Sequence, residues 1–187
     1  PPFWPHSIPR FRIPKRNASL ERSIGRFMIA WGTLERELDI CVPILFRTDP
    51  TLAICIYANL GTKAKLDMIS SAISMLAPVL PKTTVTDARS LIARIRDLSG
   101  SGRNTLAHGQ PWDFSGEKVW WLTRLAARQT LDVVIYPTNA AYWNKQATQA
   151  SRLARSWSRC NNGLLKTLRK VSDEQIYTIC EFDLRVI

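Results

Sequence analysis

The residues best suited to chemistry in this chain lie in one stretch, RNTLAHG, at residues 103–109. His108 is one of two histidines in 187 residues, and the other, His6, lies in a proline-rich N-terminal segment. Histidine is the side chain whose ordinary pKa suits proton transfer near neutral pH. Arg103 adds a fixed positive charge and Asn104 a hydrogen-bonding amide. This combination suits a reaction at a phosphate better than acyl transfer.

The spacing of these residues has geometric consequences on a helix. Asn104 and His108 are four residues apart and would share one face. Arg103 and His108 are five residues apart, or about 140° around a straight helix. They could therefore meet only through the length of the arginine, a distorted last turn or a second chain. Gly109 followed by Pro111 predicts the end of a helix, so His108 should lie in its final turn, where the helix dipole favours the imidazolium form.

This pattern of Arg-Asn, three residues and His-Gly at the end of a predicted helix resembles the signature of the HEPN superfamily, R-x(4–6)-H with a polar residue often following the arginine. The resemblance extends to a first helix rich in tryptophan and leucine and to a long last helix. It covers about residues 19–171, although its specific part is the seven-residue stretch. Members are four- or five-helix bundles, many are metal-independent ribonucleases of toxin or anti-phage systems, and many act as dimers. Some toxin members carry a modifiable tyrosine two residues after the histidine, where this chain has Gln110.

The resemblance implies a homodimeric RNA endonuclease that needs neither a metal nor another cofactor. His108 would be the general acid or base, Arg103 would hold the non-bridging phosphate oxygens, and Asn104 would orient one of them. Because one chain supplies one such histidine, two-group catalysis would need a composite site on a two-fold axis. The products would be a 2′,3′-cyclic phosphate and a 5′-OH. A toxin or anti-phage effector of this kind would have an antitoxin or another regulatory protein as a further partner.

Two other interpretations stay open from the sequence. A HEPN-like helical module could bind RNA, a nucleotide or a protein partner without cleaving anything. Alternatively, the Arg103–Asn104 pair could simply cap and pack a helix in a structural domain.

The composition indicates one cytoplasmic domain with a substantial core. Hydrophobic residues make up 45% of the chain, yet no apolar run reaches the length of a membrane span, and there is no signal-peptide pattern. We therefore expect no membrane partner. No C-x-x-C spacing or nearby acid cluster favours a metal site at His108. We expect the cysteines to be buried, reduced thiols; they are Cys41, Cys55, Cys160 and Cys180.

The net charge of +11 is distributed unevenly along the chain. Residues 117–170 hold ten basic and two acidic residues, and the N-terminal segment is also basic. A localised excess of this kind favours a polyanionic partner such as RNA over a merely soluble basic surface. A membrane-surface helix is a weaker interpretation, because the apolar face of the last helix has the regular spacing of a bundle seam. The expected RNA-binding residues form a basic stripe on that helix: Arg152, Arg155, Arg159, Lys166 and Lys170.

The elements that must position these residues are mainly helical. We expect an all-α fold, an antiparallel four- to five-helix bundle with a β-hairpin inserted at about 117–136 before the long last helix, about 139–170. Residues 1–16 should form an extended proline-rich arm, residues 17–171 the helical domain, and residues 172–187 a tail that ends in a strand or docks on the domain.

The first helix should begin near Asn17 or Ser19 and be kinked or ended by Pro43. Its acidic side chains Glu35, Glu37 and Asp39 are interpreted as a solvated face, with Glu35 also considered as reaching the active site. Its buried stripe has heptad-like spacing and is expected to be bundle core or a dimer seam: Leu20, Ile24, Phe27, Trp31, Leu34, Leu38, Cys41 and Leu45.

Three further helices should follow before the RNTLAHG stretch. A short one runs from Pro50 to about residue 59, and the next is capped by Thr62, with Lys63 and Lys65 at an ordinary exposed start or a phosphate site. The third helix reaches Gly100-Ser101-Gly102. We expect it to be weakened at these residues but to continue to His108. The two glycines would admit another backbone, such as that of a dimer mate, or simply break the helix.

Overall fold

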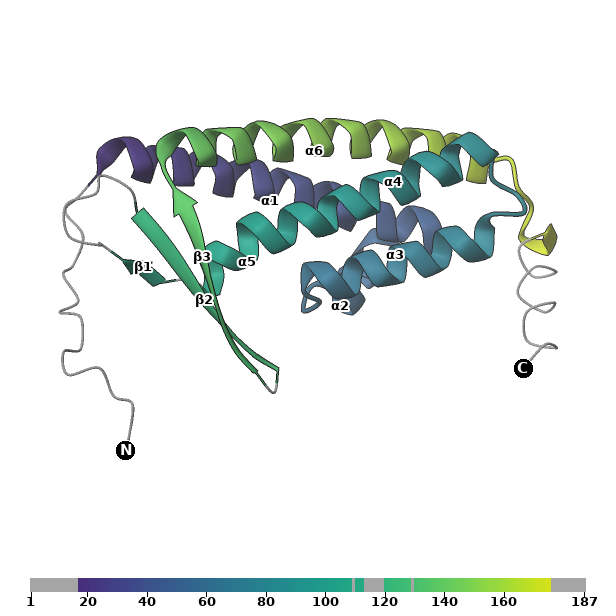
Figure 1. Ribbon diagram of the computed structural model, residues 1–187. Coiled ribbons are helices and arrows are strands. Elements are labelled where there is room, and N and C mark those ends of the chain that lie inside the picture. Colours follow the sequence, from purple (N-terminus) through teal and green to yellow (C-terminus); the bar gives the residue numbers. More distant parts are fainter. Residues whose placement is uncertain (1–16, 109, 113–119, 129, 176–187) are drawn as a thin grey trace, which may run out of the picture.

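The computed structural model describes residues 17–175 except 109, 113–119 and 129, and for residues 105, 108, 110–112, 120–128 and 130–138 it describes the backbone alone. The described part is mainly helical, which confirms the predicted fold class at that level (Figure 1). The elements in chain order are α1 (Ala18–Phe46), α2 (Pro50–Tyr57), α3 (Thr62–Leu76), α4 (Lys82–Leu98), the π-helix η1 (Ser99–Arg103), α5 (Asn104–His108), β1 (Gln110–Trp112), β2 (Trp120–Arg128), β3 (Thr130–Thr138) and α6 (Ala140–Leu168).

Three antiparallel strands lie between α5 and α6, in the order β1-β2-β3. Pro111 is opposite Leu122, and Thr123 is opposite Ile135. The predicted hairpin falls on this segment, of which residues 113–119 lie outside the described part. The strands sit at one end of the helical layer (Figure 1).

The two long helices α1 and α6 form the main packing unit, and they run in the same direction (Figure 1). The expectation of an antiparallel bundle is therefore wrong for this pair. The segment between them crosses back along the bundle, with α4 running against α6, and so returns the chain to the end where α1 began. The contacts that fix the direction rise together along both helices: Phe27 with Trp143, Glu37 with Asn161, and Arg47 with Leu168.

The core follows the predicted apolar stripes closely. Seven of the eight stripe residues of α1 are buried, and Ile24 is half-buried against the same core. Burying a large apolar side chain contributes roughly 1.5–3 kcal/mol, so the aromatic members are the main anchors of the α1–α6 contact. The largest of them are completely buried or nearly so: Phe27, Trp31, Trp143 and Trp157.

The helix ends follow the sequence signals in most places. Asn17 caps α1 by accepting a hydrogen bond from the Leu20 N–H, and Asn139 caps α6 in the same way. Pro43 does not end α1, which continues to Phe46. Within the last turn a proline removes a single backbone hydrogen bond, and the burial of Leu45 holds that turn in place.

The acidic residues of α1 do not form a solvated face, so that prediction is wrong. The Glu35 carboxylate accepts a hydrogen bond of 2.6 Å from the Thr62 hydroxyl at the start of α3. The Asn161 amide of α6 donates to the Glu37 carboxylate at 3.3 Å and to the Glu37 backbone carbonyl at 2.9 Å. Charge periodicity alone could not separate these positions from solvent, because their partners lie 27 and 124 residues away.

The start of α3 also differs from the prediction. Gly61, and not Thr62, is the residue that precedes the first helical turn. The Thr62 hydroxyl donates a hydrogen bond to Glu35 and does not cap the helix. Lys65 is buried, and its ammonium lies 2.6 Å from the Asp39 carboxylate. A bound phosphate at Lys65 is therefore not supported, because the carboxylate already holds its charge.

The cysteines divide into two groups. Burial raises the pKa of the Cys41 thiol far above its ordinary value, and burial together with the nearby Asp87 carboxylate raises the pKa of Cys160 to about 11. Cys55 is exposed on α2, so the expectation of a buried thiol is wrong there. Its helix is apolar on nearly every side, and the residue pattern therefore does not indicate which side faces solvent. Cys180 lies outside the described residues.

Among the described residues no single helix is long and apolar enough to cross a membrane, and α1 with α2, which meet that condition together, are bent by 117° at their junction.

Of the two glycines before Arg103, Gly102 is closely approached by a side chain of the same chain. A Cβ atom built on Gly102 would lie 2.7 Å from Cζ of the Phe27 ring, whereas one built on Gly100 would meet nothing within 4 Å. The ring has little room to move, because it is fully buried with its centroid 5.3 Å from that of Trp143. Gly102 is thus required by packing.

Gly102→Ala should lower the free energy of unfolding by about 1–3 kcal/mol, because the new methyl group overpacks the core against Phe27. Gly100→Ala is the matched control in the same π-helix, and it should be neutral or stabilising by about 0.5–1 kcal/mol. Urea unfolding followed by circular dichroism measures both. Equal effects of the two substitutions would contradict this packing role of Gly102.

Candidate functional site

The RNTLAHG stretch lies where α4 continues into η1 and α5. Arg103 is the last residue of η1, it is half-buried, and its Nη1 atom lies 3.4 Å from Oδ1 of Asn104. His108 is the last residue of α5, as expected for the final helical turn. The His108 side chain lies outside the described part, so the backbone alone places it relative to Arg103.

The helix between α4 and α5 is continuous, as predicted, but its weakened part is a π-helix. The Asn104 N–H donates to the Ser99 carbonyl, five residues earlier. Such a turn holds one residue more than an α-helical turn, and it therefore rotates the residues after it by about 100° relative to a straight helix. π-helical turns of this kind occur frequently at functional sites. Here the rotation changes the direction in which Arg103 leaves the helix.

The first turn of α6 supports the π-helix. The Tyr142 hydroxyl donates a hydrogen bond of 2.8 Å to the Ser101 carbonyl, in the middle of η1. The Tyr142 ring meets the Trp143 ring edge to face at 5.1 Å, and Trp143 packs on Phe27 below Gly102. Sequence reasoning did not find Tyr142, because its partner is 41 residues away and its place beside a core tryptophan indicates packing alone.

The predicted basic stripe on α6 is exposed, and the structure adds an arginine to it from α4. Arg94 lines two adjoining hollows between α4 and α6, one shared with Arg152 and the other with Arg152, Arg155 and Arg159. Their volumes are about 530 and 690 Å³. We call these two hollows the α4–α6 groove. Sequence reasoning missed Arg94 because nothing in the spacing of α4 shows which of its exposed arginines faces α6.

The lysines of the stripe do not share the groove. Lys166 is exposed on α6 seven residues beyond Arg159, or about 10 Å further along the axis. Lys170 lies beyond the end of α6. The five predicted RNA-binding residues are therefore divided between the groove and the far end of the helix.

Among the described residues that line the α4–α6 groove, none is acidic. The arginines are accompanied by neutral polar side chains that can donate or accept hydrogen bonds. These are Asn144, Thr148, Gln149, Ser156 and Ser158, and Lys145 adds a further cation at the end near η1. The groove is thus a concave surface of one charge sign, which suits a polyanion.

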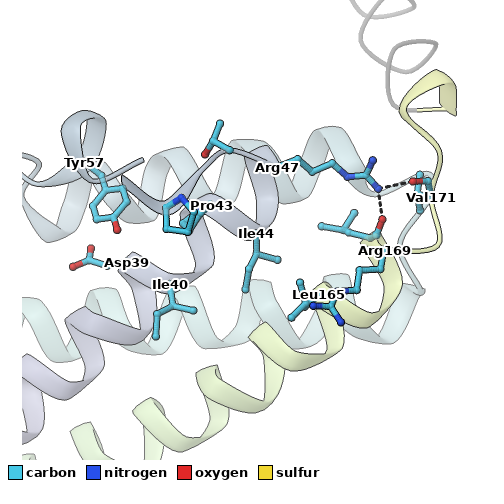
Figure 2. Close-up of a pocket in the computed structure, with 12 residues that line it drawn as sticks. Asp39, Ile40, Pro43, Ile44, Arg47, Tyr57, Leu165, Arg169 and Val171 are labelled. Carbon is cyan, nitrogen blue, oxygen red and sulfur yellow. Dashed lines mark hydrogen bonds between the residues drawn. The ribbon is translucent and has the colours of Figure 1, made fainter. Parts of the chain in front are cut away.

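Apart from the groove, a second hollow, of about 630 Å³, lies at the C-terminal end of α1, the end far from Phe27 (Figure 2). Its walls are mostly apolar, and Ile40, Pro43 and Leu165 are among them. The Arg47 guanidinium closes one side by donating to the Leu168 and Val171 carbonyls at the end of α6. The α1 residues that line this hollow begin at Asp39, twelve residues or about 18 Å along the helix beyond Phe27, so the hollow lies well away from Gly102 and Arg103.

Comparisons with protein-family models, with curated proteins and with solved structures found no match to this chain. The resemblance to the HEPN superfamily consequently rests on the residues of the motif alone.

Tyr142→Phe should loosen η1, because the Ser101 carbonyl loses its partner while the ring stays in place. We expect a loss of about 0.5–1.5 kcal/mol in unfolding free energy, and faster amide hydrogen exchange at residues 99–108. Tyr57→Phe, at the distant second hollow, is the control and should leave exchange at those residues unchanged. Unchanged exchange in Tyr142→Phe would show that the tyrosine does not hold the π-helix.

Proposed function

We propose that this chain is a HEPN-like, metal-independent RNA endonuclease that acts as a homodimer. The proposal includes the finer fold, a four- to five-helix bundle with an inserted β-hairpin. The observation that supports it best is the continuity of α4, η1 and α5, by which Arg103 and Asn104 lie on the same helical segment that carries Arg94 into the groove. Groups suited to holding a phosphate therefore adjoin a surface suited to holding a chain of phosphates.

The proposed reaction is an in-line displacement at phosphorus. A ribose 2′-OH attacks the adjacent phosphate and gives its proton to a base, the bond to the 5′-oxygen breaks, and an acid protonates that oxygen. The products are a 2′,3′-cyclic phosphate and a 5′-OH, so atoms balance without a co-reactant. His108 supplies the acid or the base, Arg103 stabilises the charge of the phosphorane, and Asn104 orients the histidine or the phosphate.

A second copy of the chain would supply the second histidine. The support for a dimer is an exposed apolar surface on α1, level with η1 along the helix but on a different face from the one that contacts η1. Ile29 is 75% exposed and Met28 is 47% exposed, and they follow Phe27, whose ring touches Gly102. Gly25 and Gly32 flank them with open space, so a partner helix could approach closely.

The alternative function is a non-catalytic module that binds RNA, a nucleotide or a protein partner. One observation favours it: the described lining of the α4–α6 groove consists of cationic and neutral polar side chains, which suit binding of a polyanion and need no proton-transfer group. If the chain is a toxin or an anti-phage effector, an antitoxin or other regulatory protein would be an additional partner under either function.

His108→Ala should lower RNA cleavage by roughly 10²–10⁴-fold, the usual effect of losing a general acid or base. Arg103→Lys should also impair cleavage, because lysine keeps the charge but loses the two-pronged contact with phosphate. The assay is labelled RNA in the presence of EDTA, with the product 3′ end examined for a cyclic phosphate. His6→Ala is the matched control, since it removes the chain's other histidine, and it should keep full activity.

Full activity of His108→Ala, or activity lost with EDTA, would refute this mechanism. A wild-type protein that binds RNA but leaves every RNA intact would instead support the non-catalytic module.

Ile29→Glu should convert the dimer to a monomer and abolish cleavage, because a charge would be buried in the proposed α1 interface. Leu52→Glu is the control, since Leu52 is 57% exposed on α2, away from this face of α1. Analytical ultracentrifugation gives the mass and circular dichroism checks the fold. A folded, fully active monomer would exclude the composite site.

A further inference from the structure

We propose that the α4–α6 groove is a track for single-stranded RNA that leads to Arg103, and that Arg94 is the binding residue on the α4 side of it. The proposal rests on the RNA-directed function proposed above, but it does not require cleavage. It also reduces the predicted set of RNA-binding residues on α6. Arg152, Arg155 and Arg159 belong to the track, and Lys166 and Lys170 do not.

The groove has cations on both of its walls. Arg94 rises from α4, and the three arginines of α6 lie opposite it, at successive turns of one helix face. Helices that pack together lie roughly 8–10 Å apart, so a groove between two of them is about as wide as one nucleic-acid strand. Guanidinium groups on both sides could contact the phosphates of that strand from two directions.

The two ends of the groove are lined by different residues. Asn144 and Lys145 line the end near η1, two and three residues beyond Tyr142, whose hydroxyl binds the Ser101 carbonyl. At the other end, beyond Arg159, the Asp87 carboxylate lies near Cys160. Burial is the larger cause of the raised pKa of the Cys160 thiol, and the Asp87 charge adds to it. The cations of the groove therefore extend from Lys145, near η1, to Arg159, and Asp87 lies beyond them.

By helix geometry the π-helix turns Arg103 closer to the side of Arg94 than a straight helix would, although Arg103 is not among the residues that line the groove. The two residues are nine positions apart, which on a straight α-helix is about 180° around the axis. The extra residue in η1 reduces this to about 80°. The axial separation is about 13 Å, so one strand in the groove could reach both arginines. The distortion, which the two glycines indicate only as a weak point in the helix, thus connects the track to Arg103.

The neutral residues of the groove favour RNA over DNA. The Gln149 and Asn144 amides and the Ser158 hydroxyl can each donate to or accept from a ribose 2′-OH, which DNA lacks. A lipid surface is a poorer fit, because the apolar face of α6 is buried against α1 and none of the described groove residues is a large hydrophobic.

The experiment measures binding of a fluorescent single-stranded RNA in the His108→Ala background, so that no cleavage interferes. Arg94→Ala should weaken binding about tenfold, because it removes a charge-assisted contact, and the slope of log K against log salt should become less steep by about 0.7. Arg89→Ala is the matched control on α4. Arg89 is also exposed, but its side chain faces α3, with Nη2 3.3 Å from the Ser74 hydroxyl oxygen. It should change neither value.

Two further comparisons separate the track from a general charge effect. Arg155→Ala should weaken binding as Arg94→Ala does, while Lys166→Ala should not. DNA of the same sequence should bind several-fold more weakly than RNA. Equal losses in Arg94→Ala, Arg89→Ala and Lys166→Ala would overturn the track, because net charge alone would then explain binding. Preference for an acidic peptide or an anionic vesicle over RNA would overturn it too.

Failure of the track and failure of the proposed enzyme are distinguishable. Loss of binding in Arg94→Ala with no cleavage by wild type would retain the track and reject the nuclease. Cleavage by wild type that Arg94→Ala leaves unchanged would retain the nuclease and reject the track.

Discussion

The contact of the Phe27 ring with Gly102 is the constraint on which the rest of the structure depends. It joins α1 to η1, and Trp143 of α6 packs on the same ring, so three segments distant in sequence meet at one fully buried aromatic side chain. A residue with a Cβ atom at position 102 would push η1 away from this junction. The path of the chain into Arg103 is therefore set by core packing as much as by backbone preference.

Polar contacts then fix the register of the helices around that junction. Glu35 and Asp39 hold the start of α3, and Glu37 receives the Asn161 amide from α6. Each is a charge-assisted or partly buried contact, which adds more to the uniqueness of the packing than an exposed pair on the surface would. Arg47 does the same at the far end, where it binds the last carbonyls of α6. With α1 and α6 in register, the start of α6 lies beside η1.

The pairing of α4 with α6 determines where the charged side chains lie. Because α4 runs against α6, Arg94 lies opposite Arg152 and its neighbours, while Asp87 lies near Cys160. Glu35 and Asp39 of α1 contact α3 and Glu37 contacts α6, and none of these three acids lines the groove. The positive surface is thus a product of helix pairing, and it begins beside the π-helix that carries Arg103.

The sequence by itself determined the helices, their caps and the buried stripes, because these depend on residues a few positions apart. Asn17 caps α1 as expected, α2 begins at Pro50 and α6 begins close to residue 139 as expected, and seven of the eight residues of the stripe from Leu20 to Leu45 are buried. The prediction that the RNTLAHG stretch ends a helix has the same local origin, because the stretch closes with Gly109 and Pro111 follows two residues later.

The tertiary structure alone decided which polar side chain faces which helix, because such partners lie tens of residues apart. It decided that α1 and α6 are parallel, that Glu37 meets Asn161, that Gly102 admits Phe27, and that Arg94 belongs to the groove while Lys166 does not. Periodicity gives the face of a helix on which a residue lies, but the neighbour that covers this face depends on how the connecting segments return the chain. That is why the candidate residues could be chosen from the sequence and the surface that they share could not.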